Sequence, residues 1–162
     1  MNLINSYAWL PEYFYTHIQT ASVPKPALIA WNEDLATHLD LNDLGADKDR
    51  LARIFSGSEP FPGGKTIAMA YAGHQFGHFV PQFGDGRAAL LGEVVSPLDG
   101  GRYDIQLKGS GQTPFSRHGD GKSSLGPVIC EYLLSEAMQR LGVPTTRALA
   151  TVEWFNRHVH PD

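Results

Sequence analysis

The sequence predicts an α+β fold in which an antiparallel sheet leads into one long helix. Three observations support this prediction. Residues 103–108 alternate between apolar and polar side chains, as a strand with one buried face does. Two Gly-Asp-Gly turns, at 84–86 and 119–121, lie on either side of that strand in the chain. Residues 125–141 carry apolar side chains at the spacing of a helix that is covered on one side.

The composition limits the classes to which this protein can belong. The 162 residues suffice for one modest domain or for part of a larger protein, and the 42% hydrophobic content can supply a core. A net charge of -4 without runs of Lys and Arg argues against nucleic-acid binding. The single cysteine, Cys130, excludes an internal disulfide framework and indicates a reducing compartment. Because there is neither a secretory leader nor an apolar run near the ~20 residues of a membrane span, we expect a soluble, cytoplasmic protein without membrane contact.

Residues 1–65 are predicted to form an amino-terminal arm with one short helix. Aromatic residues and prolines are mixed in the first 30 residues, which favours irregular structure packed on another surface. The short helix is expected within Trp31–Leu44, with Asn32 as its cap. Its apolar face would consist of Leu35, Ala36 and Leu39.

Residues 66–83 are apolar but interrupted by glycines, so we expect extended structure with bends. His74 and His78 have the spacing of two metal ligands on one helix face. Gly73 and Gly77 weaken a helix there, and no glutamate follows the first histidine as a metalloprotease motif requires. Structural or pocket-lining histidines are therefore favoured over metal ligands.

The first turn, Gly84-Asp-Gly-Arg87, also fits the start of a dinucleotide-binding fingerprint. That fingerprint needs a helix after the turn. Residues 88–95 instead contain the central Gly92 and end on two β-branched valines before Pro97, which favours a strand. We therefore expect strand–turn–strand geometry, as in the glycine-rich loop of kinases. A plain hairpin is the alternative, and a nicotinamide-dependent oxidoreductase is disfavoured.

The long helix has clear predicted ends. Ser123 or Ser124 can cap its start, and Gly142 and Pro144 stop it. A further strand is expected at 145–152. The predicted apolar stripe of the helix consists of Leu125, Val128, Ile129, Tyr132 and Leu133.

The predicted strand ends on Lys108, which we expect on the inner face of the sheet, and the long helix carries Glu131 on the same side as Leu134 and Met138. A carboxylate on a packed face is costly unless a cation meets it, and Lys108 is the expected cation. Alternatively, Glu131 lies at the edge of the face and reaches water. A glycine turn, a strand lysine and a helix glutamate in this order suit the binding of nucleotide phosphates.

Six blocks of sequence strengthen this interpretation. They are Tyr71–Gly77, Gln82–Arg87, Leu107–Arg117, Gly119–Gly121, Glu131–Met138 and Gly142–Leu149. Together these blocks resemble the selenoprotein O family of pseudokinase-fold protein adenylyltransferases. The resemblance implies a kinase-like amino-terminal lobe at 66–152, after the arm at 1–65 and before a divergent tail at 153–162.

The resemblance also implies an activity: transfer of AMP from ATP to Ser, Thr or Tyr hydroxyls of proteins, with magnesium or manganese. The family's nucleotide contacts fall on Gly84, Gly86, Arg87, Lys108, Asp120 and Gly121. Glu131 matches the helix glutamate that pairs with the lysine. Lys122 stands where the family usually has arginine, which keeps the charge but loses the two-pronged geometry. Cys130 stands where a basic residue is common.

The family's catalytic aspartate and its metal ligands match positions beyond Asp162. We therefore expect neither a catalytic nor a metal-binding residue within this chain, which looks like an amino-terminal fragment that is inactive alone. The alternative is a remnant that binds nucleotide or a partner without turnover. An ordinary kinase is a further alternative, because the same lobe serves either phosphate or AMP transfer.

Overall fold

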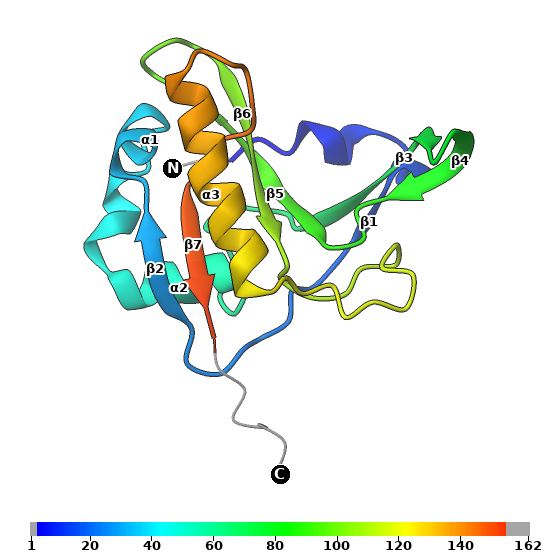
Figure 1. Ribbon diagram of the computed structural model, residues 1–162, viewed down its shortest axis with the longest axis horizontal. Helices are drawn as coiled ribbons and strands as arrows, with labels where there is room; N and C mark the ends of the chain where they lie inside the picture. The colour runs from blue at the N-terminus through cyan, green and yellow to red at the C-terminus, as the bar shows by residue number, and fades with distance from the viewer. Residues whose placement is uncertain (1–2, 155–162) are drawn as a thin grey trace. The chain divides into compact units, whose positions relative to one another are not determined.

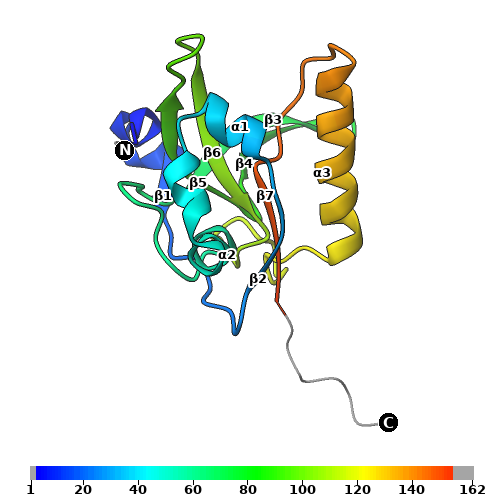
Figure 2. The same cartoon turned by 90° about the vertical axis from the view of Figure 1, so that its left-hand side faces the viewer.

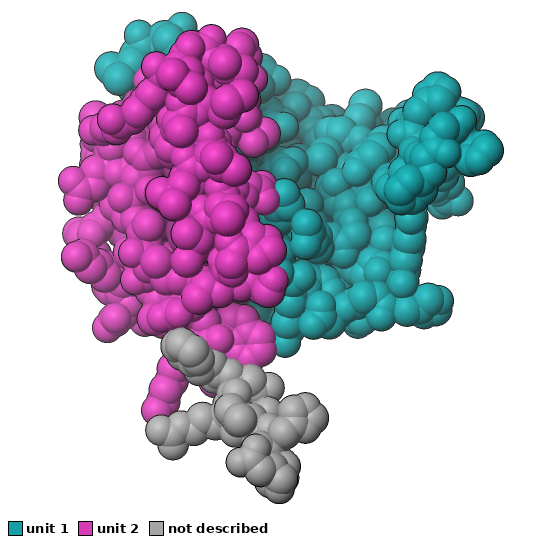
Figure 3. Space-filling model, in the orientation of Figure 1, with its two compact units in different colours: residues 1–21, 60–123 teal, residues 22–59, 124–162 magenta. Residues whose placement is uncertain are grey.

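The computed structural model describes residues 3–154. They form two compact units, each built from two stretches of the chain (Figure 3). Unit 1 comprises Met1–Ala21 and Pro60–Ser123, and unit 2 comprises Ser22–Glu59 and Ser124–Asp162. Short helices and antiparallel sheets confirm the predicted α+β class and are consistent with a kinase-like amino-terminal lobe. The predicted domain boundaries at 65 and 152 stay predictions.

Unit 1 is organised around an antiparallel sheet (Figure 1). Strand β3 pairs with β1, β4 and β5, and β5 pairs with β6. Two short 3₁₀ helices, Ser6–Trp9 and Glu12–Phe14, precede the first strand. The strands are β1 (Tyr15–His17), β3 (Ile67–Gln75), β4 (His78–Gly84), β5 (Ala88–Val95) and β6 (Arg102–Lys108).

The alternation predicted for β6 is confirmed. Ile105 and Leu107 are buried, whereas Asp104, Gln106 and Lys108 are exposed. Its partner β5 is buried from residue 89 to residue 94 and forms the centre of the unit. A strand buried on both faces requires small and aliphatic side chains, which explains the Ala-Ala-Leu-Leu-Gly run.

The amino-terminal segment closes against β5. Ile4 and Glu93 exchange two backbone hydrogen bonds, of 2.9 and 2.7 Å. The Ser6 hydroxyl donates to the buried Glu93 carboxylate, and Arg102 approaches the other carboxylate oxygen at 3.5 Å. A Cβ on Gly92 would lie 2.9 Å from the Ile4 carbonyl oxygen, so only glycine permits this approach.

The first Gly-Asp-Gly segment is not a turn between two paired strands, which corrects the predicted strand–turn–strand geometry and its plain-hairpin alternative. Gly84 at the end of β4 pairs with Ala70, and Leu90 in β5 pairs with Ile67, so both strands follow the same partner, β3. Residues 84–87 are therefore a bend between two strands along one edge of β3. The hairpin lies earlier, at Phe76 and Gly77, whose φ angles of 53° and 80° match a two-residue turn.

No helix follows Gly86, because residues 88–95 form β5. The strand predicted here is thus confirmed, and the dinucleotide-binding alternative is wrong. β5 and β6 pair antiparallel, with Ala88 opposite Lys108. His74 and His78 lie on the exposed strands of the β3–β4 hairpin, so their spacing does not put them on one helix face.

In its described residues, 22–59 and 124–154, unit 2 contains a two-stranded antiparallel sheet and three α-helices. Strands β2 (Ala27–Trp31) and β7 (Ala150–Glu153) lie side by side (Figure 2). The helices are α1 (Glu33–His38), α2 (Lys48–Ser56) and α3 (Leu125–Arg140), with a 3₁₀ helix at Asn42–Ala46. Among residues 3–154, none of the helices has the length and apolar character required to cross a bilayer.

The short helix predicted after Trp31 is confirmed as α1. The Asn32 side chain accepts a 3.0 Å hydrogen bond from the Leu35 amide, and the predicted apolar face is buried. Helix α2 was not predicted, although its signals are present. Asp47 caps its start by accepting from the Arg50 amide at 2.9 Å, and Gly57 ends it with a φ of 86°.

Helix α3 begins after Ser124 and ends before Gly142, as predicted, but the Ser124 side chain makes no capping hydrogen bond and the packed face is different. Within unit 2 it packs through Val128, Tyr132, Ser135 and Glu136. Leu125, Ile129 and Leu133 of the predicted stripe are 44%, 37% and 61% exposed. The prediction failed because the apolar residues surround much of this helix, so spacing alone does not select one side. The strand predicted at 145–152 is also shorter, since β7 starts at residue 150. Residues 155–162 of the predicted tail lie outside the described residues.

Candidate nucleotide-binding site

All six residues predicted to contact a nucleotide lie in unit 1. Three belong to the bend between β4 and β5, one ends β6, and two belong to the loop that follows β6. They are Gly84, Gly86, Arg87, Lys108, Asp120 and Gly121. Their roles stay predictions, but the local geometry can be described.

The first bend and the strand lysine are brought together by the β5–β6 ladder. The Gly109 amide donates to the Arg87 carbonyl oxygen at 2.8 Å, which fixes the backbone of Arg87 beside that of Lys108. The Arg87 guanidinium reaches Ser123 Oγ at 3.4 Å. Lys108 is exposed on the side of β6 opposite the buried Ile105 and Leu107, so the prediction that it lies on the inner face of the sheet is not confirmed. The backbones of the two cationic residues, Arg87 and Lys108, are neighbours in the β5–β6 ladder.

The second Gly-Asp-Gly turn lies against the start of the same loop. Ser110 and Lys122 form an antiparallel bridge. A Cβ on Gly121 would lie 1.9 Å from the Gly111 carbonyl oxygen, and the φ of Gly121 is 68°. The turn therefore requires glycine for its own packing, before any ligand is considered. The Asp120 carboxylate accepts from the Lys122 amide at 2.9 Å and stabilises the turn.

A loop after β6, residues 113–116, holds the first bend from one side. Thr113 Oγ1 donates to the Asp85 carbonyl oxygen at 2.5 Å, and Ser116 Oγ donates to the Gly86 carbonyl oxygen at 2.6 Å. The Phe115 ring covers Gly84 so closely that a Cβ there would lie 2.2 Å from the ring. The bend is thus held by two hydroxyls and one aromatic ring.

The next residues of this loop are backbone outliers. Arg117 and His118 have φ angles of 50° and 70°. Residues other than Gly, Asn and Asp rarely adopt such positive φ angles. The Gly119 amide closes this turn on the Ser116 carbonyl oxygen at 2.8 Å. The Arg117 guanidinium lies 4.7 Å from the centre of the Phe83 ring and donates to Gln75 at 3.1 Å. These contacts compensate the backbone strain and connect the loop to the β3–β4 hairpin.

Asp85 holds the bend from the other side. One carboxylate oxygen accepts from the Met69 amide at 3.0 Å, and the Asp85 amide donates to the Met69 carbonyl oxygen at 3.0 Å. The Tyr71 hydroxyl also donates to this carboxylate. Asp85 is 8% exposed, and this burial raises the pKa of its carboxyl above the usual value, against the lowering effect of the two donors.

Glu131, the predicted partner of Lys108, is an exposed residue of α3 in unit 2. Its neighbours on that side, Leu134 and Met138, are also exposed, at 64% and 40%. The premise that Glu131 lies on the face packed within its unit is therefore wrong. The pairing itself joins two different units and stays a prediction. Cys130, next to it, is an exposed free thiol.

Metal ligands were not expected within this chain. In residues 3–154, His, Cys, Asp and Glu side chains do not gather in groups of three or more that could hold an ion. The residues that would hold magnesium or manganese are expected at positions of the family's sequence that this chain does not cover.

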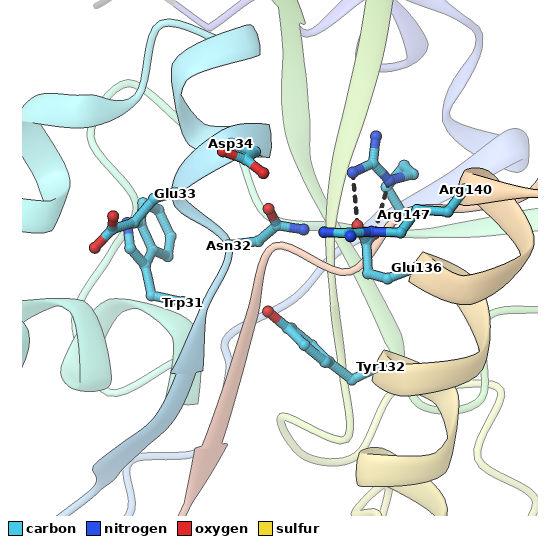
Figure 4. Close-up of a pocket in the computed structure, with 8 residues that line it drawn as sticks. All are labelled: Trp31, Asn32, Glu33, Asp34, Tyr132, Glu136, Arg140 and Arg147. Carbon is cyan, nitrogen blue, oxygen red and sulfur yellow. Dashed lines mark hydrogen bonds and ion pairs between the residues drawn. The ribbon is translucent and has the colours of Figure 1, made fainter.

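Unit 2 contains a second candidate site that the sequence did not predict (Figure 4). It is an open pocket of about 740 Å³, bordered by the end of β2, the start of α1, and α3. Its lining mixes acidic, basic and aromatic side chains. The lining residues are Trp31, Asn32, Glu33, Asp34, Tyr132, Glu136, Arg140 and Arg147.

A two-pronged ion pair organises this pocket. Arg147 donates to both carboxylate oxygens of Glu136, at 2.7 and 2.6 Å, and the Ala148 amide donates to the same carboxylate at 3.1 Å. Asn32 donates from its side chain to the Ala148 carbonyl oxygen at 3.1 Å. Arg147 is the first cause of the lowered pKa of the Glu136 carboxyl. The pair therefore ties the segment before β7 to α3 and to the cap of α1.

The first bend and the second Gly-Asp-Gly turn both lie against residues 108–111 of unit 1. Comparison with known proteins identifies the class: the family model described as "Protein adenylyltransferase SelO" matches residues 1–160. The chain belongs to this family, which confirms the resemblance seen in the sequence.

Among curated relatives, the chain is similar to proteins described as "Protein nucleotidyltransferase YdiU". The protein from Sphingopyxis alaskensis is 58% identical over 148 residues, which cover 91% of this chain and 30% of the relative. The protein from Agrobacterium fabrum is 59% identical over 152 residues, which cover 94% of this chain and 31% of the relative. The chain thus spans about a third of the length of these relatives.

The ion pair in unit 2 generates a prediction about stability. Glu136→Gln should lower the free energy of unfolding by about 2 kcal/mol at neutral pH, because it leaves the half-buried Arg147 without its charged partner. Since the Glu136 pKa is lowered in the folded state, the wild type should lose this advantage as pH falls below the ordinary value of 4.5. Urea unfolding at several pH values measures both effects.

Gln139→Ala is the matched control, as Gln139 is an exposed polar residue of the same helix. It should change stability by less than about 0.5 kcal/mol. Equal stability of Glu136→Gln and wild type at neutral pH would contradict the role given to this pair.

Proposed function

We propose that this chain supplies the ATP-binding lobe of a protein adenylyltransferase. Such an enzyme transfers AMP from ATP to Ser, Thr or Tyr hydroxyls of other proteins, using magnesium or manganese. The observation that carries the proposal is the gathering of both Gly-Asp-Gly turns around residues 108–111. It places Arg87 beside Lys108 and brings the second turn against Gly111.

The chemistry of ATP explains why these groups suit it. Its phosphates need cations and backbone amides at short range, and closely packed glycines let the backbone approach. Arg87 and Lys108 supply the charge. The chain's own residues would bind and orient the nucleotide, while a divalent metal would neutralise charge at the attacked phosphate. We propose that the metal ligands, the catalytic aspartate and the residues that bind the protein acceptor belong to the part of the family's sequence that this chain does not cover.

An alternative is that the chain binds a nucleotide or a protein partner without turnover. The mixed-charge pocket of unit 2 favours this alternative as a binding surface, because its arginines and carboxylates could pair with charged groups of a partner. We place the proposed protein in the cytoplasm, consistent with its use of ATP and with the unpaired Cys130 thiol.

The proposal predicts weak but specific ATP binding by the 162-residue chain. Lys108→Ala should weaken that binding by about tenfold or more, because a charge-assisted hydrogen bond to phosphate is lost. Isothermal titration with ATP measures the effect. Lys65→Ala is the matched control, since Lys65 is an exposed lysine of the same unit outside the two turns. Equal effects of the two substitutions would argue for non-specific charge attraction.

The isolated chain should transfer no AMP. We propose that the catalytic aspartate and the metal ligands belong to the part of the family's sequence that this chain, at about 30% of its relatives' length, does not cover, so the bound nucleotide would lack its reacting partners. The assay is incorporation of labelled AMP into a general protein acceptor with magnesium or manganese. Robust incorporation that Lys108→Ala abolishes would show that the catalytic machinery lies within these residues after all.

A further inference from the structure

The middle residue of the first Gly-Asp-Gly turn is the aspartate that the predicted nucleotide contacts leave out. Asp85 lies between Gly84 and Gly86, yet its side chain is 8% exposed and turned to β3, where it accepts from Met69 and Tyr71. A carboxylate facing a nucleotide would repel phosphate. Its orientation toward the sheet removes that repulsion.

The charge of the Asp85 carboxylate carries a cost in the folded state. Burial raises the pKa of Asp85, so the charged form costs folding free energy. Because the pKa of Asp85 is raised in the folded state, its contribution to the free energy of unfolding is present at low pH and is lost as pH rises through that pKa. At neutral pH an asparagine of the same shape would avoid this cost.

The carboxylate has one property that asparagine lacks: both of its oxygens only accept hydrogen bonds. It therefore holds the Met69 amide and the Tyr71 hydroxyl at the same time. On the opposite side, the Thr113 and Ser116 hydroxyls hold the carbonyl oxygens of the bend. The bend is fixed between β3 and the 113–116 loop, so little ordering remains to be done when a ligand arrives.

We propose that Asp85 is a positioning residue, whose carboxylate anchors the first Gly-Asp-Gly turn to β3 and so pre-aligns that turn for the phosphates of a nucleotide. The proposal rests on the proposed function, since it assumes that this turn contacts a nucleotide. It assigns Tyr71 a supporting role through its hydroxyl. Asp85 itself does not touch the ligand.

The test uses the 162-residue chain with three substitutions. Asp85→Ala removes the anchor, and Asp85→Asn keeps its shape without the charge. Asp99→Ala is the matched control, because Asp99 also accepts one backbone amide, from Gly101 at 2.7 Å, and one tyrosine hydroxyl, from Tyr103 at 2.6 Å. Asp99 lies in the connection between β5 and β6, away from both glycine turns in the chain.

Two quantities are measured at neutral pH: amide hydrogen exchange at residues 84–87 and the dissociation constant of ATP. Asp85→Ala should accelerate exchange at residues 84–87 and weaken ATP binding, each by about tenfold. Asp85→Asn should be at least as stable as wild type to urea, yet bind ATP several-fold more weakly. A merely structural role does not predict lower affinity together with unchanged or higher stability. Asp99→Ala should change neither quantity.

The proposal is overturned if Asp85→Ala exchanges and binds like wild type. It is also overturned if affinity in the Asp85 variants falls only in proportion to the unfolded fraction. A wild-type chain that does not bind ATP contradicts the proposed function instead, and the exchange rates at residues 84–87 then decide by themselves whether Asp85 anchors the bend.

Discussion

The close approach of the 113–116 loop to the first Gly-Asp-Gly bend is the constraint on which the candidate site depends. Phe115 lies where a Cβ of Gly84 would be, and the same loop binds the carbonyl oxygens of the bend. The second turn also requires glycine, because a Cβ on Gly121 would collide with the Gly111 carbonyl oxygen. Glycine is therefore required here by close packing, against an aromatic ring at Gly84 and against a backbone carbonyl oxygen at Gly121.

This constraint also explains how far the sequence could predict the structure. The strand at 102–108, the α1 cap and the ends of α3 follow from local patterns that the structure confirms. The bend at 84–87 was mistaken for a turn between paired strands, because pairing with β3 depends on residues far away in the chain. The roles of Asp85 and of the Glu136–Arg147 pair were missed for the same reason, since their partners lie 11 or more residues away.

The two units contribute differently to the proposed function. Unit 1 contains every residue predicted to contact the nucleotide, whereas unit 2 contains Glu131 and the mixed-charge pocket. Exposed apolar residues on α3 show that unit 2 does not cover this helix by itself. The family model spans both units, so the two belong to one protein architecture rather than to unrelated domains. The chain's coverage of about a third of its relatives is consistent with a lobe that acts together with further residues.

The central claim is that a nucleotide binds at the two glycine turns of unit 1. Titration of the isotope-labelled chain with ATP, followed by amide resonances in two-dimensional NMR spectra, tests it most directly. The claim predicts that the amides of Gly84, Gly86 and Gly121 shift most and saturate together. Shifts confined to the α3 pocket around Arg140 and Arg147, with the glycine amides unchanged, would contradict it.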